Sequence, residues 1–378
     1  MALASRDGGP AVASGSGTAS GTAPLSRARA KMPAMSLGQA ARSTEGTAAS
    51  ATAVDLLPVP VLADVLAAAQ RIRPHLLATP LLRHPAIEAA VGTEVWVKHE
   101  NHLPTGAFKV RGGINLVSQL SADELRRGVI AASTGNHGQS VAYAAHLLGA
   151  PAAICVPEGA NPGKVDAMAR LGAELIVGGR DFDEARESCA VLARERGMRY
   201  IHSGDEPHLI AGVATSTLEM LAHRPDIEVI IVPIGGGSGA AGACIVAKAV
   251  RPDIEVIGVQ SAQAPAAFLS WREGCPVDST TSTIAEGLAT RTAFALPQRI
   301  LRALLDDFVL VDDADILRAC LTYLEGVRQL VEPAGAASLA AAIKLAERLR
   351  SRRVAIVCSG GNVSIDQLRA IVQAEAPE

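Results

Sequence analysis

Short apolar runs rich in β-branched residues alternate with longer helical stretches from about residue 58 onward. Strands that alternate with helices in this way form a mainly parallel sheet that helices cover. The sequence therefore predicts an α/β fold. The expected strands are residues 94–98, 129–132, 152–156, 174–177, 199–202, 229–234, 255–260, 308–311 and 354–358, and helices are expected at 138–148, 162–171, 181–196, 240–250 and 334–350, among others.

The length and the charge balance limit what such a fold binds. The 378 residues give room for two domains and a large core. The formal net charge is -3 and aromatic residues make up 3% of the chain, which predicts no nucleic-acid partner. No stretch holds the ~18 uninterrupted apolar residues that a membrane span needs, so we also expect no membrane partner.

Residues 1–51 differ in composition from the rest of the chain. They are rich in Ala, Ser, Gly and Thr and contain almost no large apolar side chains, so they cannot offset their own ordering entropy. The sequence predicts a disordered tail. Scattered arginines are faintly similar to a transit peptide, and because Met32 and Met35 precede the ordered region, a start site further along the chain is an open alternative.

The six cysteines are widely spaced and include no C-x-x-C pair. This spacing favours small buried thiols in a reducing compartment over a zinc site or a disulfide framework. They are Cys155, Cys189, Cys244, Cys275, Cys320 and Cys358.

In open α/β sheets, ligands bind beyond the carboxyl ends of the strands, so unusual residues there carry the most information. Residues 133–139 (STGNHGQ) follow an expected strand and open a helix. Ser and Asn are ordinary helix caps, but a run of small and polar residues exceeds what capping needs. Backbone N–H groups at the start of a helix form a cradle for a carboxylate.

The segment 235–239 (GGGSG) also lies between an expected strand and a helix. Four glycines in five positions indicate an anion held by main-chain amides, where a tight turn needs one or two. Residues 237–242 also satisfy G-x-G-x-x-G, so a dinucleotide has to be considered. A dinucleotide site expects an acidic residue at the end of the next strand, and Gln260 stands there, so a phosphate monoester fits better.

Two further segments complete the set. Lys109 lies in residues 104–113 (PTGAFKVRGG), either as a surface lysine or as a Schiff-base lysine that close-packed glycines let a flat cofactor approach. Residues 359–362 (SGGN) follow the last expected strand and alone are an unremarkable turn. Four strand ends with small polar residues indicate one crevice assembled from distant parts of the chain.

With these segments in this order, the sequence resembles the fold-type II pyridoxal-phosphate enzymes, specifically their threonine/serine dehydratase and serine racemase branch. The resemblance covers roughly residues 66–368, and PTGAFKVRGG with SGGN is typical of the branch that acts on 3-hydroxy amino acids. It implies a tryptophan-synthase-β-like fold, with two open parallel-sheet α/β domains and pyridoxal 5'-phosphate in the cleft between them. The implied large domain is residues 52–127 plus 206–378, and the implied small, mobile domain is residues 128–205.

The resemblance also implies roles for individual residues. Lys109 would be catalytic and hold the cofactor as a Schiff base, with Phe108 beside the ring. Asn136 would hydrogen-bond the 3'-oxygen, Ser359 would face the pyridine nitrogen, and Glu332 would lie near the cofactor. The cofactor phosphate would bind Gly235, Gly236, Gly237, Ser238 and Gly239. The substrate carboxylate would bind Ser133, Thr134, Gly135, Asn136 and His137.

The implied activity is that of a dehydratase of the ammonia-lyase class (EC 4.3.1), which converts a 3-hydroxy amino acid to a 2-oxo acid and ammonia. Threonine or serine is the default substrate, and hydroxyaspartate and β-phenylserine are alternatives. Serine racemase and a non-catalytic dinucleotide-binding protein remain open as other functions. We expect a cytoplasmic homodimer, with no regulatory domain after SGGN and hence no isoleucine feedback.

At three sites, the sequence departs from the pattern of the branch or has one of its variants. Thr134 stands where racemases carry a serine that acts on the opposite face of the substrate, and we favour packing or carboxylate binding for it over proton transfer. Gln260 and Ala266 replace the acidic ligands of the branch's cation site, so no metal is expected. Glu286 stands where aspartate is usual, and capping of a turn is favoured over a role in tuning the pocket.

Overall fold

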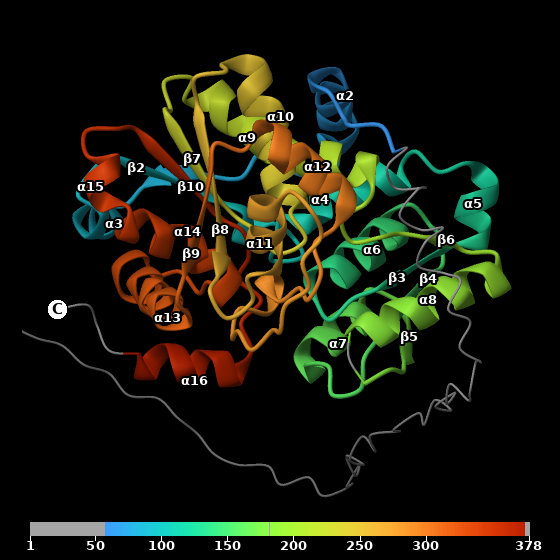
Figure 1. The fold of residues 1–378 in the computed structure, drawn as a ribbon. Coiled ribbons are helices and arrows are strands. Elements are labelled where there is room, and N and C mark those ends of the chain that lie inside the picture. The colour runs from blue at the N-terminus through green and yellow to red at the C-terminus, as the bar shows by residue number, and fades with distance from the viewer. Residues whose placement is uncertain (1–56, 181, 375–378) are drawn as a thin grey trace, which may run out of the picture. The chain divides into compact units, whose positions relative to one another are not determined.

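The computed structural model describes residues 57–180 and 182–374. Two sheets, one mainly parallel and one wholly parallel, form its framework (Figure 1). The predicted disordered tail, residues 1–51, lies outside the described residues.

The larger sheet has six strands in the order β1-β2-β10-β7-β8-β9. All neighbours are parallel except β1, which runs antiparallel to β2. The last strand of the chain, β10, therefore lies in the middle of the sheet between β2 and β7. The strands are β1 (Leu81–Arg83), β2 (Val95–His99), β7 (Val229–Pro233), β8 (Glu255–Ser261), β9 (Asp307–Val311) and β10 (Val354–Cys358).

The smaller sheet has four strands in the order β5-β4-β3-β6, all parallel. They are β3 (Val129–Ala132), β4 (Ala152–Val156), β5 (Glu174–Val177) and β6 (Arg199–Tyr200). Every strand of this sheet falls inside the segment 128–205. The domain boundaries at 128 and 205 stay a prediction.

The helices connect and cover both sheets. In chain order they are α2 (Leu62–Ile72), α3 (Pro85–Val91), α4 (Lys109–Val117), α5 (Ala122–Arg127), α6 (Asn136–Leu147), α7 (Pro162–Arg170), α8 (Phe182–Arg196), α9 (Pro207–His223), α10 (Ser238–Val250), α11 (Ala266–Glu273), α12 (Ala295–Leu304), α13 (Asp313–Thr322), α14 (Pro333–Lys344), α15 (Ala346–Leu349) and α16 (Ile365–Gln373). Short 3₁₀ turns lie at η1 (Glu100–His102) and η2 (Glu286–Leu288), and Tyr323–Val327 forms a π-helical turn.

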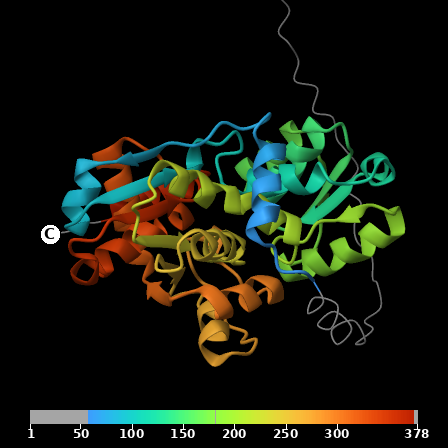
Figure 2. The same ribbon diagram turned by 90° about the horizontal axis from the view of Figure 1, so that it is seen from above.

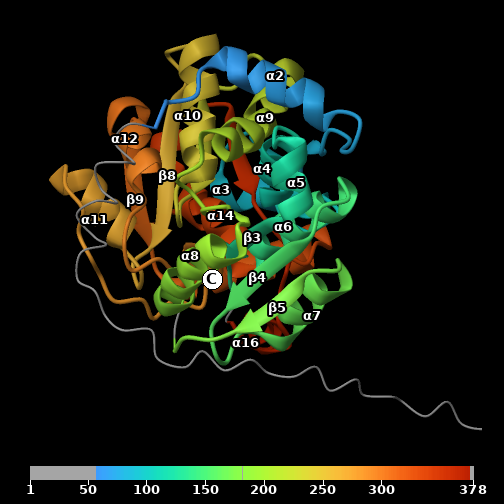
Figure 3. The same cartoon turned by 90° about the vertical axis from the view of Figure 1, so that its right-hand side faces the viewer.

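Alternate residues of the central strands enter two different cores. In β7, Val229 and Ile231 pack with α14 on one face of the sheet, while Ile230 and Val232 pack with α10 on the other. Both faces are covered, so these strands read as continuous apolar runs rather than as an apolar–polar alternation. In the smaller sheet α8 covers one face and α6 and α7 the other (Figure 3).

Helices α4 and α9 connect the two sheets. They pack against each other, α4 also packs on α6, and α9 also packs on α10. Helix α2 lies across α9 and α4, as the view from above shows (Figure 2). The start of α4 is thereby held by neighbours on several sides.

The α/β prediction is confirmed, and each expected strand is present within one or two residues of its expected bounds. Strand β1 was missed because its three residues are too short to show a pattern. The expected helix 334–350 is divided at Leu345 into α14 and α15. Five of the cysteines are buried as expected, but Cys275 is exposed. No helix within the described residues is long and apolar enough to cross a bilayer.

Candidate active site

A cavity of about 420 Å³ lies where the loops after β3, β7 and β10 meet the start of α4. All four segments singled out from the sequence line it. Every candidate site residue is part of its wall, namely Phe108, Lys109, Ser133, Thr134, Gly135, Asn136, His137, Gly235, Gly236, Gly237, Ser238, Gly239, Glu332 and Ser359. The structure thus brings the candidates together, as the sequence predicts.

The lysine segment is joined to the SGGN turn through the backbone. The amide of Phe108 donates to the Ser359 carbonyl (3.0 Å), and the amide of Gly361 donates to the Gly106 carbonyl (2.8 Å). A left-handed φ of +67° lets Gly106 make this close turn. These bonds fix the lysine beside the end of β10.

The Lys109 ammonium lies in the cavity with few partners. Its Nζ donates to the Ser203 carbonyl (3.0 Å) and to the Ser238 hydroxyl (3.2 Å), and it lies 5.4 Å from the centre of the Phe108 ring. Burial lowers the pKa of Lys109 to about 8. A share of the lysine is therefore neutral near pH 8, as a nucleophile or a general base must be.

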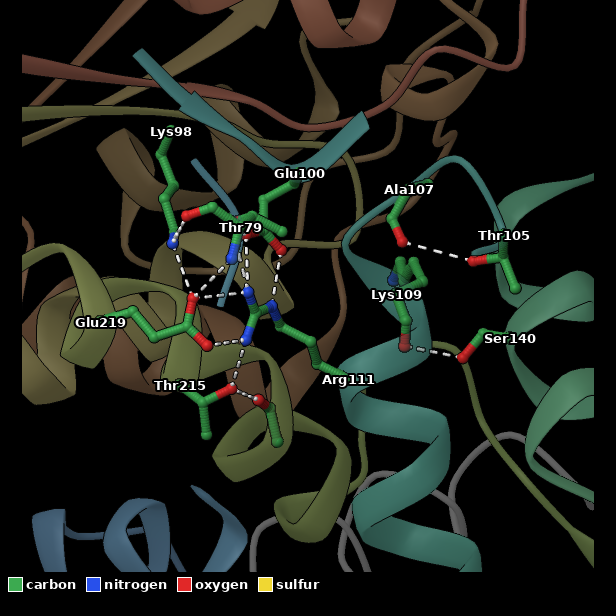
Figure 4. Close-up of polar contacts among 11 residues, drawn as sticks. Thr79, Lys98, Glu100, Thr105, Ala107, Lys109, Arg111, Ser140, Thr215 and Glu219 are labelled. Carbon is green, nitrogen blue, oxygen red and sulfur yellow. Dashed lines mark hydrogen bonds and ion pairs between the residues drawn. The ribbon is translucent and has the colours of Figure 1, made fainter. Parts of the chain in front are cut away.

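The backbone of Lys109 is anchored from two directions (Figure 4). The Ser140 hydroxyl of α6 donates to the Lys109 carbonyl (2.7 Å). Two residues further along α4, Arg111 is fully buried and binds the carboxylates of Glu100 (2.7 Å) and Glu219 (2.7 Å). The first turn of α4 is thus tied both to α6 and to a buried ionic cluster.

This ionic cluster balances two cations against two carboxylates. Besides Arg111, the Lys98 ammonium donates to Glu219 (2.6 Å), and the Thr79 hydroxyl donates to Glu100 (2.7 Å). Burial raises the pKa of the Glu100 carboxyl, but the charge and hydrogen bonds of Arg111 outweigh burial and hold that pKa below its ordinary value. The Glu100 carboxylate therefore stays ionised. Sequence reasoning missed Glu100 and Glu219, although charged residues at the end of the apolar strand 94–98 were a signal.

The glycine loop 235–239 has the form of an anion site. Within residues 57–180 and 182–374, none of its five backbone amides has a hydrogen-bond partner. Gly237 takes a left-handed φ of +87° at the start of α10. A Cβ at Gly235 would lie 2.2 Å from the Gly287 carbonyl oxygen. Unpartnered amides at a helix N-terminus, in a space that side chains would fill, fit a phosphate group.

Replacing Gly235 by alanine should weaken phosphate binding in this loop. The added Cβ meets a backbone oxygen, so the loop has to move. Overpacking of this kind costs about 1–3 kcal/mol, which corresponds to an affinity for the expected cofactor, pyridoxal phosphate, that is about 5- to 150-fold lower. Equilibrium titration of the cofactor measures it. The control is Gly149→Ala, at an exposed turn outside the cavity, where the left-handed φ of +70° strains an alanine and should lower stability but not the cofactor affinity. An unchanged affinity in Gly235→Ala would contradict the assignment.

The STGN loop after β3 is held by its own side chains. The Ser133 hydroxyl accepts from the amides of Gly135 (3.0 Å) and Gly138 (2.8 Å). His137 is buried and donates from Nε2 to the Ile201 carbonyl (3.2 Å), and burial lowers its pKa to about 3. His137 is therefore neutral, while the half-buried Thr134 faces the cavity.

A chain of side chains joins this loop to the other sheet. Asn136 donates from Nδ2 to Glu332 at the start of α14 (2.6 Å), and Asn362 of the SGGN turn donates to Asn136 Oδ1 (2.8 Å). Burial raises the pKa of the Glu332 carboxyl. The Ser359 hydroxyl donates to the Ala334 carbonyl over a long distance, 3.5 Å.

Lys164 of α7 is a cavity residue that sequence reasoning missed. Its Nζ donates to Glu286 (2.6 Å), and its methylene chain covers Gly135, where a Cβ would lie 2.8 Å from Lys164 Cδ. Glu286 does begin the η2 turn, but its carboxylate binds Lys164 and Gln367 rather than only capping that turn. No sequence pattern marked Lys164.

Gln260 lies buried at the end of β8, where its Oε1 accepts from the Phe268 amide (3.0 Å). Ala266 begins α11 and is also buried. Among the residues described, no group of three His, Cys, Asp or Glu side chains is arranged to hold a metal.

Two parallel sheets with a buried lysine and a phosphate-type glycine loop between them define a cofactor-dependent α/β enzyme. The chain belongs to the family described as pyridoxal-phosphate dependent enzymes, which matches residues 72–360. Its fold is fold type II, its cofactor is pyridoxal phosphate, and the resemblance stated from the sequence is confirmed.

Curated relatives cover most of the chain. An L-threonine ammonia-lyase of Geobacter sulfurreducens is 38% identical over 304 residues, which are 80% of this chain and 76% of the relative. One of Thermotoga maritima is 35% identical over 312 residues, 82% of this chain and 78% of the relative. An L-threo-3-hydroxyaspartate ammonia-lyase of Saccharomyces cerevisiae is 35% identical over 316 residues, 83% of this chain and 97% of the relative.

Solved structures agree in fold. The processed form of threonine deaminase isoform 2 from Solanum lycopersicum superposes with a TM-score of 0.80 at 29% identity, covering 89% of this chain and 96% of that one. Maize serine racemase superposes with a TM-score of 0.78 at 32% identity, covering 82% of this chain and 96% of that one.

Proposed function

We propose that this enzyme removes water from a 3-hydroxy amino acid, with threonine or serine as the default substrate, and releases a 2-oxo acid and ammonia. The observation that carries the proposal is the single cavity that holds the Lys109 ammonium, the glycine loop and the STGN loop. The ammonia-lyases among its relatives support the same reaction class.

The residues present fit the cofactor. Lys109 would hold it covalently, the amides of residues 235–239 would bind its phosphate, and Phe108 would lie beside its ring. Bound pyridoxal phosphate supplies an electron sink for the bond electrons at the substrate Cα. Asn136 and Glu332 would lie along the oxygen-bearing edge of the ring, where they already bind each other.

Ser359 would face the ring nitrogen. A serine hydroxyl shares a hydrogen bond with that nitrogen but cannot hold it charged, as a carboxylate would, so the ring is a weaker electron sink. Such a site favours elimination, in which charge leaves with the departing hydroxyl, over transamination.

Lys109 would then take the proton from the substrate Cα. Its pKa of about 8 suits a general base near neutral pH, because a neutral amine has to be present in useful amount. The loop residues Ser133 to His137 would hold the substrate carboxylate through backbone amides. We further propose that residues 128–205 form a small mobile domain. This domain would close over the substrate and exclude water from the active site.

Serine racemisation is the second candidate function. Thr134 lines the cavity, at the position where the racemases of the branch carry an acting serine. If Thr134 transfers a proton, Thr134→Ala should lose racemisation and keep elimination. The fold of maize serine racemase is compatible with this candidate.

We also propose a cytoplasmic homodimer. The segment from Val59 to Leu82, which includes α2, exposes several large apolar side chains on one stretch of chain. Surfaces of this kind often mark protein–protein contacts. The exposed residues are Val59, Val61, Leu66, Leu77 and Leu82.

A substrate panel tests the reaction. The L and D forms of threonine, serine, threo-3-hydroxyaspartate and β-phenylserine are assayed for 2-oxo acid and ammonia release, and chiral chromatography measures racemisation of serine. We expect L-threonine or L-serine to give the highest kcat/KM and elimination to exceed racemisation. Highest turnover of hydroxyaspartate or β-phenylserine would overturn the substrate assignment, and release from none of them would overturn the reaction.

A further inference from the structure

A second, smaller cavity of about 20 Å³ lies behind the wall of the candidate active site. It shares Phe108, Pro233, Gly239 and Ser359 with the larger cavity. The remaining wall comes from β7, α9, α10 and β10 and is apolar except for two hydroxyl residues of α9, Ser216 and Thr217. Three residues with hydroxyl side chains therefore line a small space that adjoins the larger cavity, beside the expected position of the cofactor ring.

The Ser216 hydroxyl is buried without a partner. Ser216 is 6% exposed, and its Oγ makes no hydrogen bond within the described part of the chain. A helical serine usually bonds the carbonyl one turn earlier, as Thr215 does with the Gly212 carbonyl (2.7 Å). A buried hydroxyl without a partner is costly, so native proteins satisfy such groups with a side chain or with ordered water.

A water molecule fits this space. Occupancy by one water needs roughly 10–15 Å³ of probe-occupied volume and two to four polar partners. The cavity meets the first condition with about 20 Å³, and for the second condition three residues of its wall, Ser216, Thr217 and Ser359, carry hydroxyl groups. Ser359 has bonding capacity to spare, because its contact to the Ala334 carbonyl is 3.5 Å long.

We propose that this cavity binds one ordered water molecule that bridges Ser216 and Ser359, and that Ser216 is thereby a positioning residue for Ser359. The water donates to Ser359 Oγ, so the Ser359 O–H is left to point into the larger cavity. Hydrogen bonds in such a chain polarise one another, which makes Ser359 a stronger donor. The consequence for catalysis rests on the proposed place of Ser359 at the ring nitrogen, whereas the water site itself does not.

The first test concerns the water alone. A high-resolution crystal structure of the holoenzyme should show a water within hydrogen-bond distance of Ser216 Oγ and Ser359 Oγ. Ser216→Ala should lower the Tm of the full-length protein, with and without pyridoxal phosphate, because the water loses a partner. A dry cavity, or a Tm that stays the same or rises because an unsatisfied hydroxyl has been removed, would overturn the proposal.

The second test concerns Ser359. In Ser216→Ala, the midpoint of the pH dependence of the cofactor's visible absorbance should move by roughly 0.4 to 1 pH unit, the equivalent of one net hydrogen bond. The control is Ser338→Ala in α14, whose buried hydroxyl donates to the Val357 carbonyl (2.6 Å) and lines neither cavity. It should lower the Tm and leave the midpoint unchanged.

The outcomes separate this inference from the proposed function. If Ser216→Ala loses the water and its Tm falls but the midpoint does not move, Ser216 does not position Ser359. A dry cavity in an enzyme that still releases 2-oxo acid overturns only the water site. An enzyme that holds the water but releases no 2-oxo acid from any substrate overturns only the proposed function.

Discussion

Lys109→Ala should abolish both the visible absorbance of the bound cofactor and the release of 2-oxo acid. The variant removes the amine that would hold pyridoxal phosphate covalently and would take the Cα proton. Loss of a positioned general base alone lowers the rate by about 10²–10⁴-fold, and loss of covalent attachment adds to this. Spectra of the purified protein and a coupled assay for 2-oxo acid measure the two effects separately.

Lys344→Ala is a suitable control for this experiment. Lys344 lies on α14, where its Nζ donates to the Leu310 carbonyl (2.8 Å) outside the cavity. Its loss should leave absorbance and turnover near those of the unaltered enzyme. Turnover that survived in Lys109→Ala would remove the basis of the proposed mechanism.

Arg111→Met should cause the largest loss of stability among substitutions outside the cavity. The change leaves the Glu100 carboxylate fully buried without its main partner and takes two hydrogen bonds from Glu219. Breaking a buried ion pair by removing one partner costs about 3–5 kcal/mol. The free energy of unfolding, from denaturant titration followed by circular dichroism, measures it.

Two further variants make this prediction specific. Arg348→Met removes a partially exposed arginine that pairs with Glu255 and Asp307, and exposed pairs contribute about 0–1 kcal/mol. The double variant Arg111→Met with Glu100→Gln should regain part of the lost stability, because it also removes the stranded carboxylate. If Arg111→Met and Arg348→Met lowered the free energy of unfolding by the same amount, the buried cluster would contribute no more to stability than an exposed ion pair.

The sequence predicts those features of the molecule that depend on residues close together in the chain. The glycines at 235–239 mark the strand-to-helix turn directly, and the bounds of β3, β4, β5 and β10 follow from short apolar runs. The resemblance to the family then assigns roles to residues whose roles the spacing pattern alone would leave undecided. All of them lie in the wall of one cavity, although their roles remain predictions.

The missed residues depend on contacts between distant parts of the chain. Glu219 meets Arg111 across 108 positions, and Lys164 meets Glu286 across 122. Neither pair can be recognised from the neighbouring sequence. A charged residue on a helix has the same sequence context whether its side chain contacts water or a buried charged group. Ser216 was missed for a related reason: its unpartnered hydroxyl is visible only once α9 is packed against β7 and β10.

The central place of β10 has a consequence for how the enzyme assembles. As this last strand inserts between β2 and β7, the larger sheet stays in two pieces until residues 354–358 have left the ribosome. Contacts between segments so far apart in sequence form slowly. The backbone hydrogen bond from the Phe108 amide to the Ser359 carbonyl also waits for that step, so the segment that carries Lys109 reaches its final position only late in folding.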